Sequence, residues 1–234
     1  MPYRRLPNTD TARIAALEKA VSMEHVYGVN EQAASYKTLN EARVLLRRFK
    51  NAVEQFRFCY TSQAEANRQY QTHLKTARLY ISHFIQVLNL AVVRNEVRKE
   101  HKLFYGLEPD DFTVPELTSE KHIIVWGERL IDGERERLSH GGAPIYNPTI
   151  AKVKVHYDIF KDAYGEQQNY KLNTTRAQSG LDALRSEVDS LILDLWNQVE
   201  AYYATLPPDI RISRCQAYGI IYYYRSGEKK PEND

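Results

Sequence analysis

The feature that most constrains this chain is a set of long apolar runs that no glycine or proline interrupts. In each run the apolar residues are spaced alternately three and four positions apart, which places them on one face of a helix. The first run follows Thr38-Leu-Asn-Glu41, a match to a helix capping box. The runs comprise Leu39, Ala42, Leu46, Phe49, Val53, Phe56 and Tyr60, then Leu74, Ala77, Ile81, Phe84, Leu88 and Ala91.

The same plan recurs later in the chain. A third run comprises Ile150, Val153, Tyr157, Phe160 and Tyr164, and a fourth comprises Leu181, Leu184, Val188, Leu191, Leu195 and Tyr202. The polar segments between the paired runs, 61–73 and 165–180, interrupt the apolar spacing. We therefore expect each pair of runs to form a helical hairpin with a polar tip.

Short capped helices are expected before each hairpin. Asn8-Thr9-Asp10 and Thr118-Ser119 supply N-cap side chains for these helices. Asn147-Pro148 matches an N-cap followed by proline and precedes the second hairpin. The helix stops are expected at Gly28, at Gly141-Gly142 and at Pro207-Pro208.

These elements predict an all-α fold, an up-down helical bundle of about six helices in two similar three-helix halves. We expect residues 1–106 and 119–225 to form the halves, 107–118 to form a connector and 226–234 to form a frayed tail. Tyr105-Gly-Leu and Tyr218-Gly-Ile close the two halves, which predicts an internal repeat of roughly 110 residues. The β-prone segment 219–224 predicts a short C-terminal strand, with 144–146 as its expected partner.

Four strings carry a resemblance to a known family. They are Met-Pro-Tyr-Arg-Arg-Leu-Pro-Asn-Thr-Asp at the start, Pro-Ile-Tyr-Asn-Pro-Thr-Ile at 144–150, Leu-Asp-Leu-Trp-Asn-Gln at 193–198 and Tyr-Gly-Ile-Ile-Tyr-Tyr-Tyr at 218–224. Along its whole length the chain resembles an uncharacterised all-helical family of bacterial proteins. The resemblance implies a bacterial origin, and it implies no activity, cofactor or binding residue.

Cysteine usage and hydropathy bear on the compartment. Cys59 and Cys215 are the only cysteines, too few for a disulfide framework, and we expect both to be small core residues in a reducing compartment. The opening residues lack the apolar stretch of a secretory signal. The most apolar stretch, 79–93, is too short and too polar to span a bilayer. We therefore expect a cytoplasmic protein without membrane contact.

Charge is distributed unevenly along the sequence. Residues 1–105 contain 17 Lys+Arg and 9 Asp+Glu, whereas residues 106–234 contain 15 and 21. One interpretation is that the basic half binds an anionic partner such as nucleic acid. The other is that the halves are complementary and face each other or a second copy, and this is the interpretation we prefer. The candidate anion contacts are Arg43, Arg47, Arg48, Arg94, Arg98 and Lys99, although the interpretation we prefer for them is a solvated helix surface.

The sequence contains no recognisable catalytic, cofactor or metal motif. None of the 7 histidines has an acidic residue three positions before it, so the Glu-x-x-His pairs of di-metal helical bundles are absent. His83 lies in the most apolar stretch, and we expect it to be a hydrogen-bonded core histidine. We therefore name no catalytic residue, no cofactor and no metal ligand.

Aromatic residues provide the remaining candidates. We expect Trp126 and Trp196 to be core anchors, and we treat Tyr222, Tyr223 and Tyr224 as candidate partner contacts because three consecutive strand residues cannot all face one core. The leading hypothesis is a non-enzymatic helical interaction or scaffold protein, acting on a protein partner or as a homo-oligomer. The alternatives are a nucleic-acid-associated protein and, third, an enzyme with a pocket between the halves lined by tyrosines and His83.

Overall fold

The computed structural model describes residues 3–23 and 32–224, and within these ranges the fold is all-α, as predicted. The expected stop at Gly28 and the expected frayed tail lie outside the described residues. The elements are β1 (Tyr3–Arg4), α1 (Asp10–Ser22), α2 (Tyr36–Val93), the 3₁₀ helix η2 (Lys99–Tyr105), α3 (Glu120–Ser139), α4 (Ile150–Tyr202), α5 (Pro208–Ala217) and β2 (Tyr222–Tyr223).

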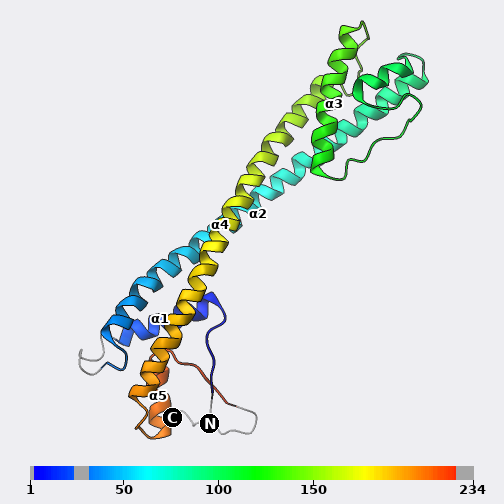
Figure 1. Cartoon of the computed structure of the whole chain (residues 1–234). Coiled ribbons are helices and arrows are strands. Elements are labelled where there is room, and N and C mark those ends of the chain that lie inside the picture. Colours follow the sequence, from blue (N-terminus) through cyan, green and yellow to red (C-terminus); the bar gives the residue numbers. More distant parts are fainter. Residues whose placement is uncertain (1–2, 24–31, 225–234) are drawn as a thin grey trace. The chain divides into compact units, whose positions relative to one another are not determined.

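Two long helices replace the two expected hairpins. α2 runs unbroken for 58 residues and α4 for 53, so the polar segments 61–73 and 165–180 are helical and the predicted tips are wrong (Figure 1). At one position where the apolar run of α2 lapses, Asn67 of α2 pairs with Gln167 of α4. Gln167 Nε2 donates to Asn67 Oδ1 at 3.2 Å, and Gln167 is buried. Polar side chains that are paired in this way do not break a helix.

The chain divides into two compact units that combine parts of both sequence halves. Unit 1 comprises residues 1–60 and 173–234, and unit 2 comprises residues 61–172. The compact units therefore do not coincide with the predicted halves 1–106 and 119–225. Each unit contains one part of α2 and one part of α4.

The core of unit 1 is formed by α1, the first part of α2, the second part of α4, and α5. Leu17 of α1, Phe49 of α2 and Val188 of α4 are all fully buried there. Trp196 is 1% exposed and is a core anchor, as predicted. Cys215 is also buried, whereas Cys59 is half-buried.

The core of unit 2 contains the second predicted apolar run, which lies on α2. All six of its predicted core positions, from Leu74 to Ala91, are buried. They pack with Tyr105 of η2, Ile123 of α3 and Phe160 of α4. Trp126 departs from expectation, since it is half-buried with the Arg129 guanidinium 5.0 Å from its ring.

Side-chain caps account for the starts of α1, α2, α3 and α4. Thr9 and Ser119 accept hydrogen bonds from the Ala12 and His122 amides, as predicted. α2, however, begins earlier than expected, because the Ser35 hydroxyl accepts from the Thr38 amide at 3.1 Å. At the start of α4 the Thr149 hydroxyl accepts a hydrogen bond from the Lys152 amide at 3.4 Å. Thr149 is therefore the N-cap, and the predicted cap Asn147-Pro148 lies before it.

The predicted C-terminal strand exists as β2, but its partner is different. β2 pairs antiparallel with β1, with Tyr3 opposite Tyr223 and Arg4 opposite Tyr222. Residues 144–146 are not in a strand. Arg4 also donates to Glu200 of α4 at 2.9 Å, which fixes the ribbon to unit 1.

The two Tyr-Gly motifs have the same local geometry. Tyr105 and Tyr218 are both fully buried, and Gly106 and Gly219 both adopt positive φ, 69° and 89°. Only glycine adopts that conformation without strain. These shared features are compatible with the internal repeat, which stays a prediction.

Candidate functional site

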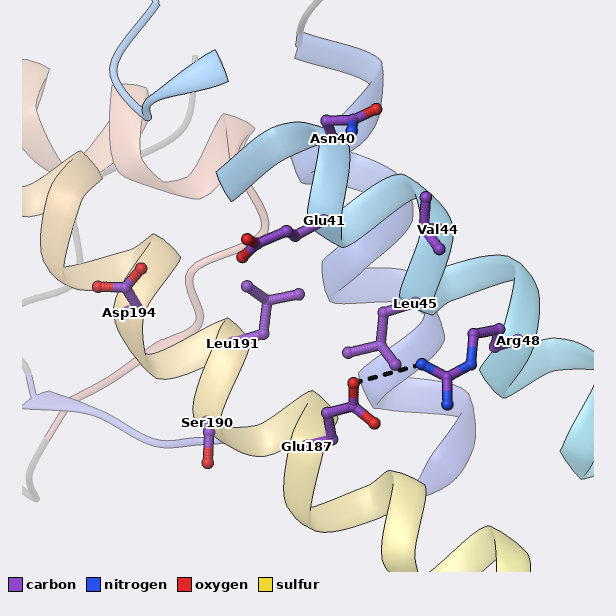
Figure 2. Close-up of a pocket in the computed structure, with 9 residues that line it drawn as sticks. All are labelled: Asn40, Glu41, Val44, Leu45, Arg48, Glu187, Ser190, Leu191 and Asp194. Carbon is purple, nitrogen blue, oxygen red and sulfur yellow. Dashed lines mark hydrogen bonds and ion pairs between the residues drawn. The ribbon is translucent and has the colours of Figure 1, made fainter. Parts of the chain in front are cut away.

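A groove on the surface of unit 1 is the candidate functional site. It has a volume of about 600 Å³ and lies between α2 and α4 (Figure 2). Val44 is 54% exposed at its α2 edge, and Leu45 and Leu191 form its floor. This first hollow of the groove is lined by Asn40, Glu41, Val44, Leu45, Arg48, Glu187, Ser190, Leu191 and Asp194.

A second hollow lies further along the same two helices, and the two hollows together are called the groove below. It has a volume of about 580 Å³, and its lining begins four residues beyond Arg48 on α2 and three residues before Glu187 on α4. Phe58, 72% exposed, lies at its α2 edge, and a Cβ added to Gly180 would meet no atom within 4 Å. Its lining is small or apolar at Ala52, Cys59, Ala177, Gly180, Leu181 and Leu184, with Gln55, Phe58, Asn173 and Arg176 at its sides.

Helix α1 lies on the opposite side of α2 and α4 from this groove. Lys50 of α2 pairs with Glu18 of α1 at 2.5 Å, and Asp189 of α4 pairs with Arg13 of α1 at 2.7 Å. Lys50 and Asp189 each follow a groove residue by two positions, which is about 200° around a helix. The groove is therefore on the face of the α2–α4 pair that α1 leaves uncovered.

Each charged residue of the first hollow has a partner. Arg48 Nη1 contacts Glu187 at 3.4 Å across the groove, as the dashed line in Figure 2 shows. Asp194 accepts from Gln198 Nε2 at 2.8 Å, and Glu41 lies 3.9 Å from Lys37. An apolar floor with charged edges is typical of a surface that contacts another macromolecule.

The groove contains carboxylates but no histidine and no group that could hold a metal ion. No histidine lines either of its hollows. Across residues 3–23 and 32–224, no group of three His, Cys, Asp or Glu side chains is placed to hold a metal ion. The chemistry that the groove residues provide is apolar contact and charge pairing.

The candidate anion contacts fall into two groups in different units. Arg43, Arg47 and Arg48 lie in unit 1, and Arg94, Arg98 and Lys99 lie in unit 2. All six are exposed, and at least three of them pair with carboxylates. These are Arg48 with Glu187, Arg94 with Glu96 at 2.8 Å, and Lys99 with Asp110 at 2.8 Å.

The charge imbalance between the sequence halves disappears when charge is counted by compact unit. Unit 1 contains 17 Lys+Arg and 15 Asp+Glu, and unit 2 contains 15 of each. Within unit 1, basic residues of the first half pair with acidic residues of the second, as Arg4 does with Glu200 and Arg13 with Asp189. Within unit 1, residues of the first and second sequence halves therefore form ion pairs with each other.

The C-terminal tyrosines have different environments. The Tyr222 hydroxyl donates to Glu200 at 2.7 Å, and burial is the main reason why the pKa of this phenol is raised. Tyr223 is 43% exposed and its ring lies 6.1 Å from that of Tyr3, while Tyr224 is half-buried. Of these three tyrosines, Tyr223 is the one whose side chain faces solvent.

His83 is exposed on α2, so the expectation of a core histidine is wrong. Its position explains the difference, because it lies two residues after the buried Ile81, about 200° around the helix. A histidine within an apolar stretch of sequence therefore need not face the core, because its position around the helix decides whether it is buried.

Sequence reasoning missed the groove, although a signal for it exists. Glu41, Val44, Arg48, Ala52, Gln55 and Cys59 follow one another at spacings of three or four residues. They form a second stripe on α2 beside the apolar one. Its mixed polarity hid it, because amphipathic patterns are recognised by their apolar members.

Among the described residues there is one helix, α2, whose length and composition would allow it to cross a membrane. This is a weak indication, since buried core helices share the property, and 44% of the relevant window is buried.

Comparisons with protein-family models, with curated proteins and with solved structures found no match.

Proposed function

We propose that this chain is a non-catalytic helical protein that functions by protein–protein contact, with the α2–α4 groove of unit 1 as the contact surface. The observation that carries the proposal is the uncovered face itself. α1 covers one side of the helix pair through the Arg13–Asp189 and Lys50–Glu18 ion pairs, while Val44 and Phe58 are exposed on the other side. Large exposed apolar side chains beside a groove are a common feature of interaction sites.

Site-specific crosslinking in cells tests this proposal. A photoreactive amino acid replaces Val44 in the full chain, and the control replaces Glu54, which is exposed on α2 and does not line the groove. Illumination is expected to give a discrete higher-mass adduct from position 44 and none from position 54. Failure to crosslink from position 44, or equal adducts from both positions, contradicts a contact function for this face.

Nucleic-acid association stays a prediction with less support. Its premise was a basic N-terminal half, and the carboxylate pairing of Arg48, Arg94 and Lys99 lowers the charge available to phosphates. Filter binding at low and high salt measures it directly. Retention that falls steeply with salt would support it.

A further inference from the structure

A small polar cavity in unit 2 lies outside the groove and plays no part in the proposed contact function. It has a volume of about 280 Å³ and is lined by side chains of α2 between residues 62 and 73 and of α4 between residues 163 and 170. Apart from two alanines, every residue that lines it carries a polar group. We propose that this cavity binds a small organic cation with two or more ammonium groups, such as a linear polyamine.

The cavity has a net negative charge. Glu65 of α2 and Glu166 of α4 both line it, and its lining contains no lysine or arginine. In the part of the chain that the structure describes, neither of these carboxylate groups takes part in a hydrogen bond or an ion pair. Glu128 of the same unit, by contrast, pairs with Lys161 at 2.8 Å. Two unpaired carboxylates from different helices at one cavity attract a ligand that carries positive charge at more than one point.

A buried hydrogen-bond acceptor on the cavity wall is the second, independent observation. Gln167 lines the cavity and is 2% exposed, and its Oε1 has no hydrogen-bond partner among the described residues. Its Nε2 donates to Asn67, which does not line the cavity, so the oxygen is the amide atom that is left for a ligand. A buried acceptor without a partner is costly. An ammonium group, which has only donors, supplies what this oxygen lacks.

The chemistry of the lining favours an organic cation over a metal ion. Within residues 3–23 and 32–224, no three His, Cys, Asp or Glu side chains are grouped so that they could hold a metal ion. Tyr170 also lines the cavity, and aromatic rings attract ammonium groups. The volume lies just below the range typical of drug-sized ligands, which matches a slender aliphatic chain.

The cavity exists because two of its lining residues are small. Ala66 of α2 and Ala163 of α4 are both half-buried and line it. A larger apolar side chain at either position would occupy the space without changing any charge. Ala163→Leu therefore removes the room for a ligand and keeps both carboxylates and Gln167.

Isothermal titration calorimetry of the full chain with spermidine tests the inference. A salt concentration of about 0.15 M screens non-specific attraction between exposed charges. Wild type is expected to bind one spermidine per chain, and Ala163→Leu should abolish binding. Glu166→Gln should weaken binding about threefold, and the double variant with Glu65→Gln about tenfold. Gln167→Leu removes the buried acceptor and should weaken binding about tenfold.

Asp162→Asn is the matched control for Glu166→Gln. It removes one negative charge from an exposed position on the same helix, next to Ala163, but Asp162 does not line the cavity. It should leave the Kd for spermidine unchanged. Circular dichroism checks that each variant is helical, and if Gln167→Leu loses helicity, the carboxylate and Ala163 variants still decide the result.

Four outcomes overturn the inference. They are no saturable binding of spermidine by the wild type, full binding by Ala163→Leu, equal weakening by Asp162→Asn and Glu166→Gln, and loss of spermidine binding in an equal concentration of Mg²⁺. The last two would show that the protein attracts cations through its overall charge, without a site shaped for an organic ligand.

Discussion

Arg137 and Glu134 form a fully buried, bidentate ion pair within one turn of α3. Both side chains are 1% exposed, and Arg137 Nε and Nη2 contact the two carboxylate oxygens of Glu134 at 2.9 Å each. The Tyr105 hydroxyl of η2 also donates to Glu134, and burial together with this carboxylate raises the pKa of Tyr105. Arg137 Nη2 donates in addition to the Ala143 carbonyl at 2.7 Å.

Removing one member of this pair should be costly. Arg137→Met leaves the Glu134 carboxylate buried without its cation, and the free energy of unfolding is expected to fall by about 3–5 kcal/mol. Urea denaturation followed by circular dichroism measures the loss. Arg135→Ala is the control, since its pair with Asp132 is exposed on the same helix and should contribute less than about 1 kcal/mol. Similar losses from both variants would contradict a special role for burial.

The close packing of α3 on η2 depends on Gly133. A Cβ at this position would lie 2.6 Å from the Phe104 carbonyl oxygen, and backbone cannot move aside cheaply. Gly133→Ala should therefore destabilise the protein by about 1–3 kcal/mol through overpacking. Thermal unfolding provides the measurement. Gly165→Ala in α4 meets no atom within 4 Å and should stabilise by about 0.5–1 kcal/mol, so an equal sign for the two variants would refute the packing argument.

Asp10 couples stability to acid pH. Its hydrogen bonds to Arg185 are the largest reason why the pKa of this carboxyl lies below its ordinary 3.8. A lowered folded-state pKa stabilises the fold at pH above the ordinary value, and the contribution is lost as the pH falls through the folded-state pKa. Asp10→Asn should therefore cost about 1–2 kcal/mol near pH 7 and less at about pH 3. Urea titrations at the two pH values give the comparison.

The control for this pH dependence is Asp132→Asn. Asp132 is 68% exposed and pairs with Arg135 at 3.0 Å. Solvent screens such a pair, so its loss should change stability little at either pH. A penalty for Asp10→Asn that stays constant between the two pH values would show that ionisation of Asp10 is not the source of its contribution.

The helical class and the core could be predicted because burial follows apolar periodicity. Every predicted core position from Leu74 to Ala91 is buried, and Thr9 and Ser119 cap their helices as expected. The strand pairing could not be predicted in the same way. β1 contains only Tyr3 and Arg4, which is too short to show any alternation of polarity, and its pairing with β2 joins the two ends of the described chain.

The groove could not be predicted for a different reason. Its existence depends on the side of α2 and α4 that α1 covers, and that is set by pairs such as Arg13–Asp189, which are 176 residues apart. The sequence shows that both stripes of α2 exist. It does not show which of them another element covers, because that depends on contacts between distant segments.

The unbroken course of α2 through the predicted hairpin tip can be tested at Ala64. This residue is exposed in the interior of the helix. Proline there removes a backbone hydrogen bond and clashes with the preceding turn, so Ala64→Pro should cost about 3 kcal/mol or more. Ala64→Ser keeps the amide and should cost about 0.5 kcal/mol. A hairpin tip would tolerate both substitutions, because loop residues have no such hydrogen bond to lose. If urea denaturation gives the two variants equal stability, α2 is not continuous at this point.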